Sequence, residues 1–206
     1  MKKKLLEIFV CMLLLTTMLP MTVTVIAGDE ENPEVEDRTL DVKLFGFIGF
    51  PLQTSFKYAD IVSAWFSEES TDTDNLYVSI KVMDLQEKTN LEAIYDVNWV
   101  LNNKRYLTCV HANPNGYGPF LIGENTYGGD DYEWDTCSGN FDLDNNIITW
   151  EIPKDAIGNP QKGDKLTYIF PSTHLRFRDD SNLPRMDLFK DLAWNAKIIK
   201  DYTIEY

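Results

Sequence analysis

Residues 137–170 constrain the fold more than any other part of the chain, because they contain two stretches of alternating apolar and polar residues. In the first, residues 148–152 read Ile-Thr-Trp-Glu-Ile, which is the two-residue period of a half-buried β-strand. Pro153 ends this stretch, and residues 158–164 (Gly-Asn-Pro-Gln-Lys-Gly-Asp) are rich in turn formers. A second alternation begins at residues 166–170, with its Leu, Tyr and Phe expected on one strand face. The segment therefore predicts antiparallel β-structure.

Similar alternation recurs through the chain. Further strands are expected at residues 60–66, 76–82, 95–99, 106–111 and 201–206. Asn102, Asn103 and Lys104 favour a turn that joins two of these strands as a hairpin. A helix is expected only within residues 183–195, where Pro184 limits its length. Many short strands with turns between them predict an all-β fold, an antiparallel β-sandwich of jelly-roll type, as one domain over residues 39–206.

The N-terminal residues have the features of an export signal. Residues 1–27 combine a head of three lysines, an apolar run and a small residue, Ala27, at the expected cleavage point. An uncleaved membrane anchor is the alternative, since the apolar run is long enough to span a bilayer. Residues 28–38 are acidic and are expected to form a flexible leader. The sequence predicts a secreted or cell-surface protein, which contacts the membrane only if residues 1–27 stay attached.

The net charge limits which partners the protein can bind, and the cysteine content indicates the compartment in which it folds. The formal net charge is −14, and loss of residues 1–27 would remove three lysines and one glutamate, changing it to −16. Because a protein this acidic repels the phosphate backbone of nucleic acid, nucleic-acid binding is not expected. Cys109 and Cys137 are the two cysteines outside the signal, and an even pair in an oxidising compartment predicts a disulfide worth about 3 kcal/mol.

The segment from residue 113 to residue 135 is the strongest candidate for a binding site. It is rich in glycine and aromatic residues and is expected to be a long loop. Aromatic faces stack on sugar rings while carboxylates bind hydroxyl groups, so the segment suits a carbohydrate. The alternative is that the loop covers one end of the sandwich and its rings cap the core. The candidate ligand-binding residues are Tyr117, Tyr127, Asp130, Asp131, Tyr132 and Trp134.

Two acidic turns are candidates for calcium binding. Asp72 and Asp74 lie in one, and Asp142 and Asp144 lie in the other. Closely spaced carboxylates and carbonyl groups can supply the six to eight oxygen ligands of Ca²⁺. Asp and Asn also occur in turns simply because their side chains bond the backbone there. The sequence thus leaves Ca²⁺ as a possible cofactor and predicts no other.

The strand and turn motifs together resemble a β-sandwich module of archaeal and bacterial cell-surface proteins. This module is related to DOMON domains and to family-nine carbohydrate-binding modules. The likeness covers about residues 40–206. The resemblance implies a non-catalytic domain that binds a ligand or mediates adhesion, without the attached protease that often accompanies such modules. The motifs that carry it are residues 59–66, 76–84, 95–99, 141–142, 148–153 and 158–160.

Some DOMON domains hold haem through Met and His, so the resemblance also implies Met83 and His111 as a less favoured haem site. Catalysis is not expected, because His111 and His174 are the two histidines and no nucleophile motif accompanies either one. The favoured function is recognition of a carbohydrate or a cell-surface protein by a non-enzymatic module. The alternatives are a structural or accessory envelope protein and an inhibitor of a secreted hydrolase.

Overall fold

The fold is all-β and antiparallel, as the alternating pattern predicts. The computed structural model describes residues 28–44, 56–126, 131–176, 187–193 and 196–206. Within these residues the complete 3-10 turns are η1 (Lys57–Ala59) and η2 (Lys154–Ile157), and Ala193 is also in 3-10 conformation. The strands are β1 (Val35–Glu36), β2 (Lys43–Leu44), β3 (Ile61–Glu69), β4 (Asp72–Val82), β5 (Glu92–Leu101), β6 (Lys104–Asn113), β7 (Gly116–Tyr117), β8 (Phe120–Thr126), β9 (Glu133–Asp142), β10 (Ile147–Pro153), β11 (Lys165–Arg176), β12 (Asp187–Leu192), β13 (Ile198–Ile199) and β14 (Tyr202–Thr203).

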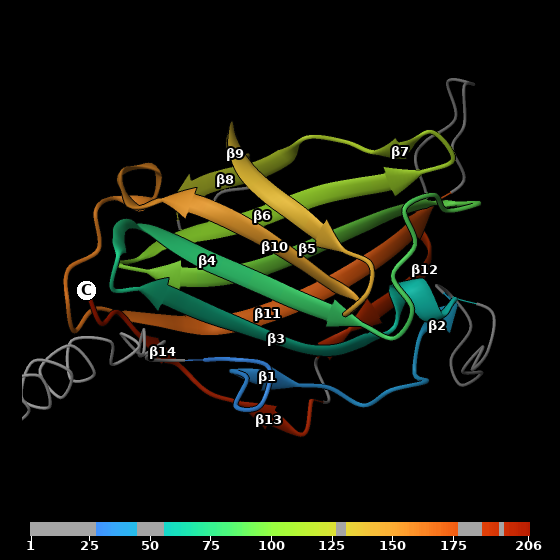
Figure 1. The fold of residues 1–206 in the computed structure, drawn as a ribbon, viewed down its shortest axis with the longest axis horizontal. Helices are drawn as coiled ribbons and strands as arrows, with labels where there is room; N and C mark the ends of the chain where they lie inside the picture. The colour runs from blue at the N-terminus through green and yellow to red at the C-terminus, as the bar shows by residue number, and fades with distance from the viewer. Residues whose placement is uncertain (1–27, 45–55, 127–130, 177–186, 194–195) are drawn as a thin grey trace, which may run out of the picture.

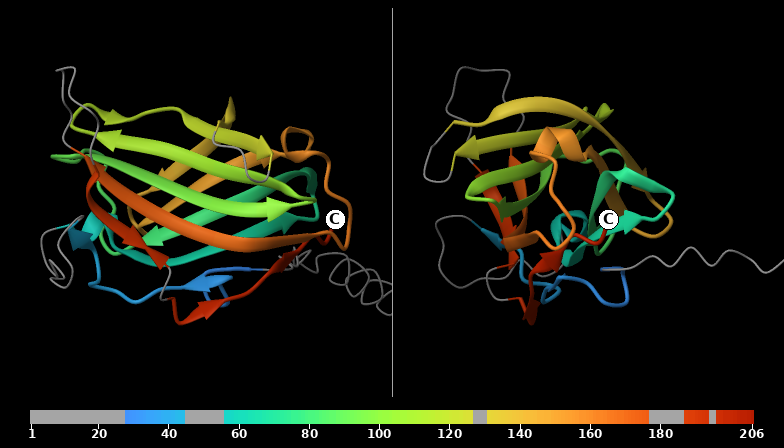
Figure 2. Two further views of the ribbon diagram at one scale, coloured as in Figure 1. Left: turned by 180° about the vertical axis from the view of Figure 1, so that it is seen from behind. Right: turned by 90° about the vertical axis from the view of Figure 1, so that its left-hand side faces the viewer.

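The strands form one sheet that curls on itself. Its order is β13-β1-β3-β4-β10-β9-β8-β6-β5-β11-β12-β2, with β14 beside β11 and β7 beside β6. Strands β3, β4 and β10 make one layer and β6, β5 and β11 make the other, while β9 crosses between them (Figure 1). Seen from one end, the curled sheet is an open barrel (Figure 2). The two layers enclose a common apolar core, as the sheets of a sandwich do.

The core is built from the strand faces that the sequence pattern identifies. Ile148, Trp150 and Ile152 on β10 are fully buried, as is Trp99 on β5 in the facing layer. The expected hairpin is confirmed, because β5 and β6 pair up to the turn at Asn102 and Asn103. Both asparagines have positive φ angles, which a tight two-residue hairpin turn requires.

The expected alternation over residues 166–170 breaks at Tyr168. Leu166 is buried, but Tyr168 is 76% exposed and Ile169 is buried. The pairing of β11 with β5 shifts register between Thr167 and Phe170, and Tyr168 has a φ of 52°. This β-bulge inserts one residue and turns the Tyr168 side chain to solvent.

Two expectations about chain segments differ from the structure. The segment 28–38 was expected to be a flexible leader, but it contains β1, which pairs with both β3 and β13. Glu34 and Val35 are buried there. In the segment 183–195, the residues Asp187–Leu192 form strand β12 instead of a helix. The expected signal, residues 1–27, lies outside the described residues.

None of the described residues belongs to a helix long and apolar enough to cross a membrane.

The predicted disulfide is wrong, because Cys109 and Cys137 are both free thiols. Cys109 on β6 pairs with Leu121 of β8, whereas Cys137 on β9 pairs with Phe120, so β8 lies between the two cysteines. Two strand spacings are about 9.5 Å, beyond the roughly 7 Å between Cα atoms that a disulfide allows. Adjacent residues 120 and 121 also point to opposite sheet faces, and so therefore do the two cysteines.

Candidate functional site

The segment expected to be an aromatic loop is largely β-structure. It contains β7, β8 and the first residues of β9. Tyr117, at 50% exposure, stacks on Phe141 with ring centroids 4.4 Å apart, and Phe141 also contacts the buried ring of Tyr95. Tyr117 therefore caps the open edge of the core, which matches the alternative interpretation of this segment.

Tyr132 and Trp134 lie on the other side of the sheet. They are two residues apart in an extended chain, so they share a face, and their ring centroids are 5.5 Å apart. Trp134 pairs with Gly123 on β8, and Gly123 is next to the core residue Ile122, which places Trp134 on the outer face. Trp134 is 48% exposed.

Gly123 allows these rings to lie against the sheet. A Cβ atom at position 123 would lie 3.0 Å from Cε3 and Cζ3 of Trp134 and 3.1 Å from Cδ1 of Tyr132. The absence of a side chain therefore lets both rings contact the strand backbone. We call Gly123, Tyr132 and Trp134 the aromatic platform.

The other residues expected in this site are only partly placed. Asp131 is exposed next to Tyr132. Tyr127 and Asp130 lie outside the described residues. The structure thus brings Tyr132 and Trp134 together and separates them from Tyr117, which is on the core side of the sheet.

A row of residues runs across the outer face from the aromatic platform. Trp134 pairs with Gly123, Gly123 with Leu107, and Leu107 with Asn98. Three strand spacings, about 14 Å, therefore separate Trp134 from Asn98. The amide of Asn98 donates to Asp96 Oδ1 at 3.1 Å.

Asp96 belongs to a compact polar network with Ser172 and His174. The Ser172 hydroxyl donates to Asp96, and His174 Nε2 lies 3.2 Å from the Ser172 Oγ and 3.4 Å from Asp96 Oδ2. A catalytic triad needs the carboxylate on the ring nitrogen that faces away from the serine. Here both partners face Nε2, and the carboxylate accepts the serine proton. Asp96 therefore does not occupy the position from which a triad carboxylate orients the histidine.

The residues implied as haem ligands are not brought to one site. His111 Nδ1 lies 3.0 Å from Oε1 of Glu92. His111 alternates with the buried Val110 and Ala112 on β6, so it points away from the core. Met83 directly follows β4, in the layer on the other side of the core.

The two acidic turns lie at opposite ends of β4. Asp72 begins β4, whereas Asp142 pairs with Ile147, which pairs with Lys81 near the end of β4. Asp72 accepts from Asn75 and Tyr77, and Asp142 accepts from Asn145, and these bonds hold the pKa of both carboxyl groups below the usual range. The four candidate calcium ligands, which include the exposed Asp74 and Asp144, therefore lie in two separate turns, and calcium binding at either turn stays a prediction.

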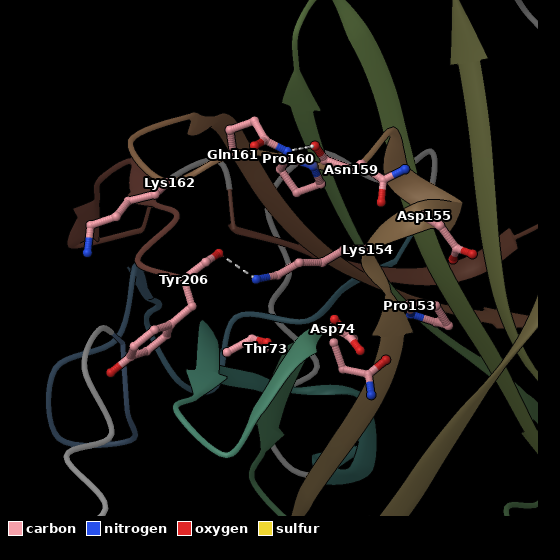
Figure 3. Close-up of a pocket in the computed structure, with 11 residues that line it drawn as sticks. Thr73, Asp74, Pro153, Lys154, Asp155, Asn159, Pro160, Gln161, Lys162 and Tyr206 are labelled. Carbon is pink, nitrogen blue, oxygen red and sulfur yellow. Dashed lines mark hydrogen bonds between the residues drawn. The ribbon is translucent and has the colours of Figure 1, made fainter.

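A polar pocket of about 600 Å³ lies beside the first of these turns (Figure 3). It is lined by residues 73–75 of β4, residues 153–155, the turn at 159–162 and Tyr206. Lys154 Nζ donates to the backbone oxygen of Tyr206 at 2.8 Å across it. The ammonium group of Lys154 thus already binds protein partners, the Tyr206 backbone oxygen and the Glu68 carboxylate.

Sequence reasoning missed a cluster of carboxylates near the start of β3. Oxygen atoms of Asp37, Asp41 and Asp191 lie within 4.8 Å of one another. Asp60 is next to them, and Asp37, Asp60 and Asp191 are each 2% exposed. Burial, together with the charges of its neighbours, raises the pKa of Asp191 to about 8 and that of Asp60 to about 6. No local sequence motif joins these positions, because they come from three separate segments, residues 37–41, 60 and 191.

No protein-family model, no curated protein and no solved structure matches this chain.

Proposed function

We propose that the protein is an exported, non-catalytic module that binds carbohydrate at the aromatic platform. The observation that carries the proposal is the pair of neighbouring rings, Tyr132 and Trp134, on the outer face of β8 and β9 with Trp134 half exposed. The apolar faces of sugar rings stack on such aromatic surfaces. Export is proposed from the sequence of residues 1–27.

The surroundings of the platform suit an extended ligand. Arg105, Leu107 and Asn98 on the adjacent strands are partly exposed and continue the outer face beyond Gly123. The polar groups of this row can exchange hydrogen bonds with hydroxyl groups, while the rings at its end provide the stacking surface. We therefore favour a glycan chain of several sugar units, lying across the strands, over a single sugar.

The test is a screen of polysaccharides and oligosaccharides, followed by calorimetry on each ligand found. Loss of stacking energy predicts that Trp134→Ala weakens binding about tenfold or more. Gly123→Ala keeps both rings but displaces them, so it should weaken binding by a smaller factor. Tyr168→Ala removes an exposed aromatic residue from β11 and serves as the matched control. A screen without ligands, or binding unchanged in Trp134→Ala, would refute the proposal.

One observation favours the alternative of an accessory envelope protein or a hydrolase inhibitor. Ile198 and Ile199, at 42% and 53% exposure, lie on β13, the last strand of the sheet order. An exposed apolar edge strand can pair with a strand of another protein. Under this alternative the protein inhibits a secreted glycoside hydrolase or protease in a panel assay, and Ile199→Lys abolishes the inhibition while leaving glycan binding intact.

A further inference from the structure

The three buried aspartates, Asp37, Asp60 and Asp191, and the half-buried Asp41 lie together in the fold. Asp37 directly follows β1 and Asp60 directly precedes β3, so both belong to one edge region of the curled sheet. Asp191 lies in β12 and Asp41 precedes β2, so these two belong to the opposite edge region. The cluster therefore lies where the two edges of the open barrel approach each other.

Backbone groups hold two of the carboxylates in place. Leu40 N–H donates to Asp60 Oδ2 at 2.6 Å, which links Asp60 to the segment between Asp37 and Asp41. Ile61 N–H donates to Asp191 Oδ2 at 2.7 Å, which links β12 to the start of β3. The carboxylates of Asp60 and Asp191 are thus each held in place by a backbone N–H group next to the cluster.

A second observation points to a ligand. Asp60 is only 2% exposed, and its buried Oδ1 has no hydrogen-bond partner among the described residues. Oδ1 of Asp41 is likewise buried and has no hydrogen-bond partner in the part of the chain that the structure describes. Desolvated carboxylate oxygens without partners are strongly unfavourable, and mutual repulsion among four acidic groups adds to this. A bound cation would supply the missing partner and offset the repulsion.

We propose that Asp37, Asp41, Asp60 and Asp191 form a calcium site that joins the two edges of the curled sheet. The donor atoms are carboxylate oxygens, which suit a hard cation. Oxygens of Asp37, Asp41 and Asp191 lie within 4.8 Å of one another, about twice the Ca²⁺–oxygen bond length of roughly 2.4 Å, so one ion can contact all three carboxylates. Asp60 is beside these three groups and interacts electrostatically with Asp37 and Asp41. The smaller Mg²⁺ ion needs oxygens roughly 4 Å apart across its centre.

The test uses the mature chain, residues 28–206, freed of metal by a chelator. Titration with CaCl2 should show one bound ion per chain in calorimetry, and thermal unfolding should shift upward by several degrees with added Ca²⁺ and less with Mg²⁺. Asp60→Asn and Asp191→Asn each keep an oxygen acceptor for the backbone bond. Both variants should lose the calcium-dependent shift. Asp142→Asn, in an exposed acidic turn, is the matched control and should retain it.

Two results would overturn the proposal. If the wild-type protein binds no Ca²⁺ at millimolar concentration, the carboxyl groups share protons instead of a cation. In that case Asp191→Asn stabilises the metal-free protein and the wild type unfolds at one temperature with or without Ca²⁺. If calcium binds equally to Asp60→Asn, to Asp191→Asn and to the wild type, the ion occupies another part of the chain.

Discussion

Lys154 Nζ lies 2.5 Å from Oε1 of Glu68, and both side chains are almost completely buried. The other Glu68 oxygen, Oε2, accepts from the hydroxyl of Tyr202 at 2.9 Å and from the N–H of Glu205 at 2.7 Å. One carboxylate therefore ties η2 and the C-terminal segment to β3.

Replacing Glu68 by Gln should strongly destabilise the protein. The amide group places a donor where the carboxylate accepts, and the Lys154 charge stays buried without its counter-charge. We expect a loss of about 3 kcal/mol or more in the free energy of unfolding, measured by denaturant titration. The double variant Glu68→Gln/Lys154→Met removes the orphaned charge and should recover part of the loss.

The control for this prediction is Lys104→Gln, which breaks the exposed ion pair with Glu124. It should change stability by about 1 kcal/mol or less. Equal effects of Glu68→Gln and Lys104→Gln would show that the buried pair has no special structural role.

Gly139 should not tolerate a side chain. A Cβ atom there would overlap the ring of Phe120, a side chain that is 7% exposed and belongs to the core. Gly139→Ala should lower the free energy of unfolding by about 1–3 kcal/mol through overpacking. Gly118→Ala is the control, since its Cβ would come no closer than 3.8 Å to a non-neighbouring atom. A neutral Gly139→Ala would contradict the position of Phe120.

Glu34 should make stability depend on pH. Burial raises the pKa of Glu34 to about 7 from 4.5, although the N–H of Phe66 donates to its carboxylate and Lys200 attracts it. The folded state holds this proton more tightly than the unfolded state. The contribution of Glu34 to the free energy of unfolding is therefore fully present below pH 4.5 and is lost as the pH rises through about 7. The contribution is about 3 kcal/mol.

The measurement is denaturant unfolding of the wild type and of Glu34→Gln from pH 4 to pH 9. The neutral amide removes the titrating group, so the wild type should lose stability relative to the variant across this range. Parallel stability curves for the two proteins would show that Glu34 titrates normally. The two proteins can differ in stability by a constant amount at every pH. The test is whether the difference between their free energies of unfolding changes with pH.

Both cysteines should remain reduced and unreactive in the folded protein. Burial raises the pKa of Cys109 to about 12 and that of Cys137 to about 11, so little thiolate forms at neutral pH. Alkylation after unfolding without a reductant should add two groups to a protein of residues 28–206, as measured by mass spectrometry. An intact mass with no added groups would mean that a disulfide has formed and that β8 does not separate these residues as described.

The strands and the hairpin could be predicted because their causes are local. Ile148, Trp150 and Ile152 alternate with polar residues, and Asn102 and Asn103 accept positive φ angles, so a short window of sequence contains the signal. The bulge at Tyr168 could not be predicted in this way. Its side chain faces solvent because β11 shifts register against β5, which is a property of the strand pair.

The candidate sites can likewise be separated into features with local causes and features that depend on strand pairing. Tyr132 and Trp134 are close in sequence, so their shared face could be inferred, whereas their separation from Tyr117 depends on which sheet face each residue occupies. The disulfide prediction failed because spacing along the chain does not reveal that β8 lies between Cys109 and Cys137.

The sequence by itself determined the all-β class, the main strands and the turn of the central hairpin, since side-chain periodicity and turn chemistry act over a few residues. Tertiary structure alone decided the order of the strands, the free state of the two thiols and the meeting of Asp37, Asp41, Asp60 and Asp191. The physical reason is that closure of the curled sheet brings together residues as far apart as 37 and 191. Burial then raises the pKa of the Asp60 and Asp191 carboxyl groups.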